Sequence, residues 1–167
     1  AQVPHTRSPR VARSDIPRLC AGCHGDPARL KTRHVFSEQA PVSSYAHTIH
    51  GQAFAAGLTG AAVCTDCHGT HAVRGSSHPD SRVFRANIPN TCGRCHRAEQ
   101  VAYDGSMHGR AMRDGIKEAP VCTDCHGEHT IRSWRDPASS VWAGAVTKTC
   151  SRCPASERVL AKFGLPL

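Results

Sequence analysis

The pattern C-x-x-C-H constrains this chain most, because it occurs four times in 167 residues. Its members are Cys20, Cys23 and His24; Cys64, Cys67 and His68; Cys92, Cys95 and His96; and Cys122, Cys125 and His126. The pattern is typical of covalent haem attachment, because two thiols at this spacing can add to the two vinyl groups of one porphyrin. The adjoining histidine then binds the iron. The spacing predicts about four c-type haems, held by these cysteines and ligated by these histidines.

Zinc ribbons and thioredoxin-type sites also use C-x-x-C pairs, but neither needs a histidine directly after every pair. A zinc-binding module on nucleic acid would also account for the net charge of +8. The basic residues are spread along the chain, however, and four haems would bring about eight propionate charges for them to neutralise. We therefore expect haem rather than zinc, and no nucleic-acid partner.

A fifth cysteine pair, Cys150-Ser-Arg-Cys153, departs from the pattern because it is followed by Pro154, which cannot ligate iron. We expect a degenerate site whose thiols stay free or form a local disulfide. Pro154 would then start a short helix that ends at Gly164. The alternative is a fifth haem on these thiols with an axial histidine from elsewhere. The prediction is haem at four motifs and none at this pair.

The sequence contains an internal repeat. The segment from His50 to Cys92 matches the segment from His108 to Cys150 without a gap. A duplicated module with two haem motifs is the simplest cause. We predict an N-terminal arm over residues 1–15, two-haem modules over 16–87 and 88–146, and a degenerate third-module start with a C-terminal helix over 147–167.

Four further histidines are retained in register in both copies, namely His50, His71, His108 and His129. Four haems closed on both faces need four second ligands, and neutral imidazole binds iron well. We predict these four as the distal ligands. His71 follows His68 so closely that it is expected to reach a neighbouring haem, and the same holds for His129. Which histidine serves which haem stays open. Short helices over 44–56 and 102–113 are expected to hold His50 and His108.

Composition argues against an ordinary apolar core. Only 39% of the residues are hydrophobic and 5% aromatic, with 14 glycines and 11 prolines. Such a chain is expected to depend on a bound group for its stability. We predict a mostly irregular fold with short α-helices around a core of stacked haems. The sequence has no run of about 20 apolar residues, so no membrane span is predicted. The start at Ala1-Gln2-Val3 is interpreted as the mature form of an exported, periplasmic or extracellular protein.

The stretches from His50-Gly51 to His71 and from Asn90 to His96 resemble the modules of bacterial and archaeal multihaem cytochromes c. That group includes tetrahaem electron carriers and extracellular cytochrome filaments. The resemblance covers most of residues 16–153. It implies bis-histidine haems stacked alternately parallel and T-shaped, with redox proteins or extracellular electron acceptors as partners. In the filament-forming members a histidine of one subunit completes a haem of the next, which would give His5, His34 or His47 a use.

We therefore expect an electron-transfer protein and not an enzyme. Two histidines on each iron leave no position at which a substrate binds. The competing function is a multihaem reductase of a small nitrogen or sulfur oxyanion, which needs an open haem. Within the electron-transfer class, a periplasmic carrier competes with a filament subunit, a homopolymer with haem contacts between its subunits.

Overall fold

The computed structural model describes residues 11–26 and 41–153. About half of these residues are helical, and none of them forms a strand. The first group of elements is η1 (Arg13–Asp15), α1 (Ile16–His24), α3 (Pro41–Ala46), α4 (Ile49–Ala55) and α5 (Cys64–His68). The second is η2 (Arg85–Asn87), α6 (Ile88–Gly93), α7 (Arg97–Gly105), α8 (Met107–Arg113), α9 (Cys122–His126) and α10 (Val146–Ser151). The expected short helices joined by irregular segments are confirmed, and no described helix is long or apolar enough to cross a membrane.

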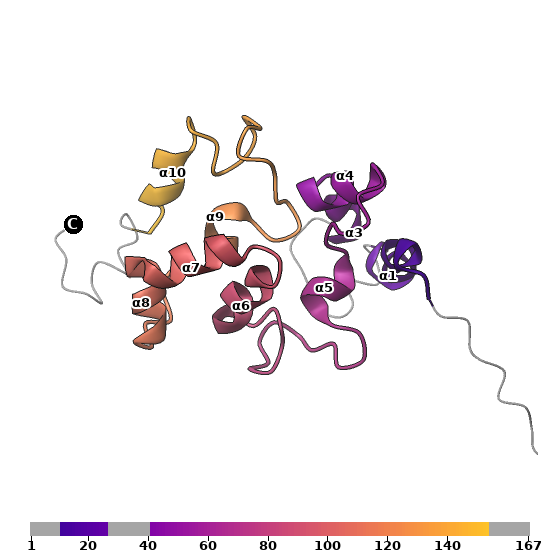
Figure 1. Ribbon diagram of the computed structural model, residues 1–167, viewed down its shortest axis with the longest axis horizontal. Helices are drawn as coiled ribbons and strands as arrows, with labels where there is room; N and C mark the ends of the chain where they lie inside the picture. The colour runs from indigo at the N-terminus through magenta and orange to yellow at the C-terminus, as the bar shows by residue number, and fades with distance from the viewer. Residues whose placement is uncertain (1–10, 27–40, 154–167) are drawn as a thin grey trace, which may run out of the picture.

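The two groups of helices lie at opposite sides of the molecule (Figure 1). Helices α1, α3, α4 and α5 gather on one side, and the helices from α7 to α10 extend over the other. A backbone hydrogen bond from the amide of Ile49 to the carbonyl of Ile131, 2.9 Å long, joins the two halves. The boundaries at residues 15, 87 and 146 remain predictions, and the expected helix after Pro154 lies outside the described residues.

The helices predicted over 44–56 and 102–113 are wrong as single elements, because each is divided in two. Thr48 separates α3 from α4, and Ser106 separates α7 from α8. Both residues have extended backbone, and their hydroxyls accept hydrogen bonds from the amides of Gly51 and Gly109 at 3.0 and 3.2 Å. A serine or threonine in this role starts a new helix, so each pair of helices meets at a sharp bend.

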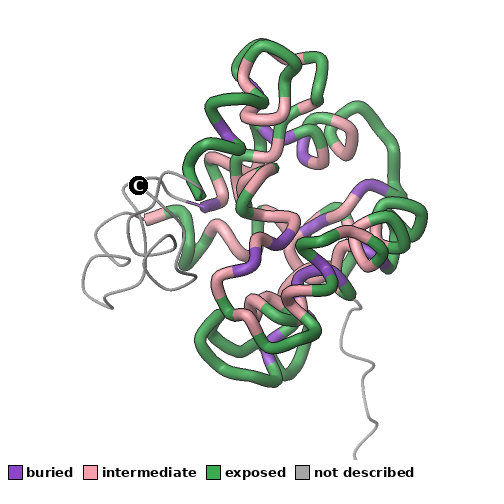
Figure 2. The backbone as a smooth tube through the Cα atoms, turned by 90° about the vertical axis from the view of Figure 1, so that its left-hand side faces the viewer, coloured by how far each residue is buried: buried purple, intermediate pink, exposed green. Residues whose placement is uncertain are grey.

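Little apolar surface is buried by the protein itself. The buried hydrophobic side chains among the described residues are Ala61, Val63, Ile88, Ala119 and Val121, all aliphatic and mostly small. Figure 2 shows the buried stretches as short pieces separated by longer exposed and half-buried ones. Large apolar side chains such as Met107 and Trp134 stay 70% and 64% exposed. This is the sparse core that the composition predicts.

Equivalent positions of the sequence repeat make the same hydrogen bonds. The hydroxyl of Tyr45 donates to the carbonyl of Ala62 at 2.8 Å, and that of Tyr103 to the carbonyl of Pro120 at 3.1 Å. Each tyrosine therefore ties the helix that carries it to the segment that leads into the next C-x-x-C-H helix.

The sequence analysis missed two arginines that connect distant segments, one in each half of the molecule. The Arg13 side chain donates to the carbonyls of Thr59 and Ala61 at 3.0 and 2.8 Å and to the carboxylate of Asp66. Arg85 makes the matching bonds to Lys117, Ala119 and Asp124. The available signal was that both arginines stand three residues before an Ile-Pro pair, at Ile16 and at Ile88.

Replacing Arg85 by alanine is expected to lower the free energy of unfolding. The change removes a forked contact to Asp124 and leaves two carbonyls without their donor. Because the two side chains are 40% and 33% exposed, solvent screens the pair, and we expect a loss of about 1–2 kcal/mol. Thermal unfolding measures it.

Arg18→Ala is the matched control for that experiment. Arg18 is 77% exposed and makes a single contact of 3.3 Å to Asp15. Its loss is expected to change stability by no more than about 0.5 kcal/mol. Equal losses in the two variants would show that the contacts of Arg85 do not hold the second half together.

Candidate haem sites

Helices α5 and α9 consist of the motif residues themselves. Cysteines at positions i and i+3 of a helix lie on one face, so both thiols of each motif point to the same side. The carboxylates of Asp66 and Asp124 accept hydrogen bonds from the amides of Val63 and Val121 at 2.7 and 2.6 Å, which fixes the first turn. Each helix ends at its histidine because the next residue is a glycine with positive φ, 84° at Gly69.

The other two motifs are held by longer or looser segments. Helix α1 carries Cys20, Cys23 and His24 within its last turns. Helix α6 ends one residue after Cys92. His96 follows in a turn, and the amide of His96 donates to the carbonyl of Cys92 at 3.0 Å. In all four motifs the two thiols and the histidine therefore stay within one or two turns of backbone.

The thiols of successive motifs are neighbours in space. Burial, together with the neighbouring Cys20 thiol, raises the pKa of Cys64 to about 11. The interaction between the neighbouring thiols of Cys92 and Cys122 raises the pKa of Cys92 and lowers that of Cys122. Burial raises the pKa of Cys67, and the Cys95 thiol adds to this. The four motifs thus form a series in the order of the sequence.

Two pairs of imidazole rings face each other at a spacing that fits an iron atom. The ring centroids of His68 and His129 are 6.0 Å apart with planes 6° from parallel, and those of His50 and His96 are 6.0 Å apart at 46°. Two metal–nitrogen bonds of about 2 Å, plus the distance from each nitrogen to its ring centre, give about 6 Å between centroids. The centroid spacing of each pair therefore matches the spacing of two imidazoles that share one iron.

The two pairs cross between the halves of the molecule. His129 belongs to the second half but faces His68 of the first, and His50 belongs to the first half but faces His96 of the second. Burial lowers the pKa of His50, His68 and His129. These imidazoles are therefore neutral near pH 7, and the neutral ring is the form that binds a metal.

The structure brings only four of the eight predicted iron ligands into ring pairs. His24 also lies near His68 and His129, and His126 lies near His96. His71 and His108 are exposed and have no ring partner among the described residues, and the same is true of His24 and His126. His47 and His78 are also exposed, whereas His5 and His34 lie outside the described residues. The two halves share a sequence pattern, but only the histidines at their junction meet.

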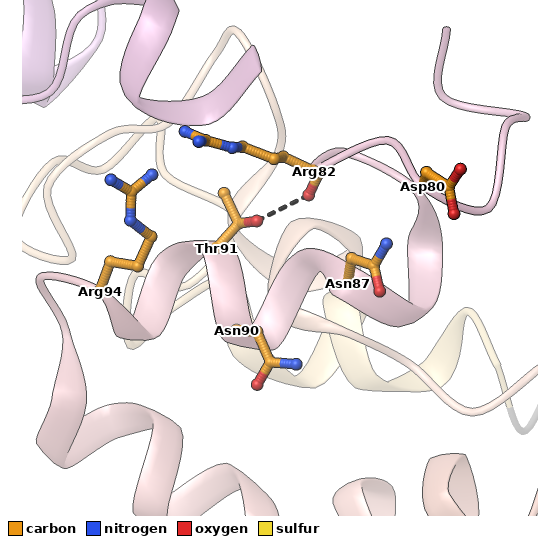
Figure 3. Close-up of a pocket in the computed structure, with 6 residues that line it drawn as sticks. All are labelled: Asp80, Arg82, Asn87, Asn90, Thr91 and Arg94. Atoms are coloured by element: carbon orange, nitrogen blue, oxygen red, sulfur yellow. Dashed lines mark hydrogen bonds between the residues drawn. The ribbon is translucent and has the colours of Figure 1, made fainter. Parts of the chain in front are cut away.

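Two further features of the described residues bear on ligand binding. Among these residues, no three His, Cys, Asp or Glu side chains converge on one point as in a protein-only metal site. A surface hollow of about 390 Å³ is lined by Asp80, Arg82, Asn87, Asn90, Thr91 and Arg94 (Figure 3). None of its lining residues is a cysteine or histidine, but Thr91 and Arg94 flank Cys92, so the hollow borders the third motif.

Comparison with known proteins gives no match. No family model fits the chain, and no curated protein or solved structure is similar to it. The functional argument therefore rests on the motifs and on the placement of their side chains.

Proposed function

We propose that this protein transfers electrons along a row of four covalently bound c-type haems. The observation that carries the proposal is the pair of crossed imidazole couples, each at 6.0 Å, in which one histidine directly follows a C-x-x-C pair. Such a couple supplies both axial ligands of an iron, and the adjacent thiols supply the covalent attachment.

The residues of the chain have separate roles in this proposal. The eight motif cysteines attach the four porphyrins, and His24, His68, His96 and His126 bind the irons from the motif side. His129 and His50 close the two inner haems, at the second and third motifs. Haem supplies a one-electron couple between ferric and ferrous iron. Two histidines on an iron favour the ferric form more than a His/Met pair does and leave no position for a substrate.

The order of the motifs supports conduction along a row. Cys20 lies near Cys64, Cys92 near Cys122, and Cys67 near Cys95, so successive porphyrins would be attached at neighbouring points. An electron entering at one end of the series then has short steps to the other. The first and fourth motifs, which stand at the two ends, are the expected places of exchange with partner proteins or extracellular acceptors.

The sparse core and the charge of the chain also support the proposal. Leu19, Ile49 and Met107 are 50%, 41% and 70% exposed, and each lies next to a motif cysteine or to one of the repeated histidines. Apolar side chains in such places are expected to be covered, and a porphyrin face would cover them. The net charge of +8 suits the propionates that the haems would bring.

The test is to identify the haem-bearing peptides of the purified native protein and to record its electron paramagnetic resonance spectrum. We expect haem on each of the four C-x-x-C-H peptides and low-spin signals from at least the two inner haems. Reversible reduction by a small electron donor should involve every haem. A colourless protein, or one that binds zinc at these cysteines, would overturn the proposal.

The same preparation separates the competing functions. Turnover of nitrite, hydroxylamine or sulfite at a high-spin haem would favour the reductase over the conduit. Sedimentation separates the two forms of the conduit, because a carrier remains a monomer whereas a filament subunit assembles.

A further inference from the structure

We propose that Cys150 and Cys153 form a fifth covalent haem site, with His108 as its one histidine ligand and the opposite axial position open to a small external ligand. This inference rests on the proposed function, because it takes the third C-x-x-C-H motif as a haem site and finds the same structure at the fifth cysteine pair. Pro154 alone predicted a degenerate pair, whereas the backbone around Cys150 and Cys153 matches that around Cys92 and Cys95.

The fifth pair is folded in the same way as the third motif. Helix α10 begins and ends at the positions of the repeat that correspond to the ends of α6. The hydroxyl of Thr149 donates to the carbonyl of Ser140 at 2.7 Å. The hydroxyl of Thr91 donates to the carbonyl of Arg82 at the same distance (Figure 3). The backbone around Cys150 and Cys153 therefore has the arrangement found around Cys92 and Cys95.

The surroundings of the fifth pair also match those of the third motif. Ser139 is 4% exposed, as its counterpart Ser81 is 2% exposed. Cys125 of the fourth motif lies near Cys150 and Cys153, just as Cys67 of the second motif lies near Cys95. The fifth pair therefore stands beside the fourth motif as the third motif stands beside the second, and it continues the series.

His108 occupies the position that His50 has in the first half. Each histidine is the second residue of its helix, and each helix is capped by a hydroxyl bonded to the following Gly51 or Gly109 amide. His50 faces the histidine that follows Cys95. By the same relation His108 serves the haem of Cys150 and Cys153, and it is exposed and without a ring partner among the described residues.

The attachment chemistry needs only what the site holds. Both thiols are free. Each adds across one vinyl group of haem, so that a carbon–sulfur bond forms, the vinyl double bond becomes single, and the thiol hydrogen moves to the other vinyl carbon. No electrons are gained or lost. Pro154 offers no donor atom, so the iron keeps one axial position for a neutral or anionic donor such as imidazole.

The experiment is a count of haems on the native holoprotein by intact mass, together with peptide mapping. We expect five haems, one of them on the peptide that contains Cys150 and Cys153. The double variant Cys150→Ser, Cys153→Ser should carry four. Imidazole added to the ferric proteins should convert high-spin haem to low-spin haem. The amount converted should be one haem equivalent larger in the wild-type protein than in the double variant.

The role of His108 is tested by resonance Raman spectroscopy of the ferrous protein. The double serine variant should lack one iron–histidine stretching band of the wild-type protein. His108→Ala should lack the same band, whereas His47→Ala should keep it. His47 is the control because it is exposed and has no counterpart in the repeat. If His47→Ala loses this band, or His108→Ala keeps it, the ligand assignment is wrong.

Each remaining outcome decides one claim. Haem on the four C-x-x-C-H peptides but none on the Cys150–Cys153 peptide overturns this inference and leaves the proposed function standing. Haem on none of the four overturns the proposed function itself. Five haems with an equal imidazole response in both proteins would mean that the fifth iron is closed, which overturns the open position.

Discussion

Replacing His129 by alanine is expected to open one haem of the holoprotein without changing the number of haems attached. The His129 ring stands 6.0 Å from that of His68, with nearly parallel planes, and no other imidazole ring faces His68 among the described residues. Cys64 and Cys67 would still hold the porphyrin. One low-spin haem equivalent should therefore become high-spin, and its iron should bind added imidazole. Electron paramagnetic resonance measures both effects.

His78→Ala is the control for this variant. His78 is exposed, contacts Arg74 at 2.8 Å and the amide of Asp80 at 3.1 Å, and has no counterpart in the repeat. Replacing His78 should not change the amount of low-spin haem. If His129→Ala kept all its low-spin signal, the crossed pairing would be wrong, and the second ligand of this haem would come from elsewhere.

Gly51→Ala is expected to cause the largest loss of stability. A methyl group at Gly51 would overlap the carbonyl oxygen of Tyr45 and would lie 3.1 Å from the Cα atom of Ala46. Both atoms belong to the backbone at the end of α3, so no side-chain rotation relieves the clash. We expect the free energy of unfolding to fall by about 3 kcal/mol, which is the upper part of the range for overpacked sites. Thermal unfolding followed through the haem absorption measures it.

The same change should also disturb iron ligation, because Gly51 directly follows His50. A shift of α4 would draw the His50 ring away from His96 and weaken the low-spin signal of the third haem. Gly105→Ala is the matched control, since nothing lies within 4 Å of its added methyl group and alanine favours a helix. Equal melting temperatures for the two variants would show that the tight bend between α3 and α4 is not required.

Some features of the fold were beyond sequence reasoning. The bends at Thr48 and Ser106 depend on two hydroxyls that cap a new helix, where the sequence analysis expected one continuous helix. The arginine contacts of Arg13 and Arg85 join residues far apart in the chain, and an isolated basic residue gives no sign of a distant carboxylate. The arginine contacts arise where distant chain segments meet, whereas each bend depends on a capping bond to the amide three residues further on.

The sequence by itself determined which chemistry is proposed. Haem attachment needs two thiols and a histidine within five residues, so C-x-x-C-H is a local signal that predicts the cofactor, and the repeat singled out His50, His71, His108 and His129. Only the tertiary structure decided which of these histidines meet a partner. His71 and His129 occupy the same place in the repeat, yet only His129 lies where the two halves meet and can face a motif of the other half. The proposed iron ligation across the halves depends on how the halves pack. Two copies of one pattern have different neighbours, and the pattern within a copy does not record them.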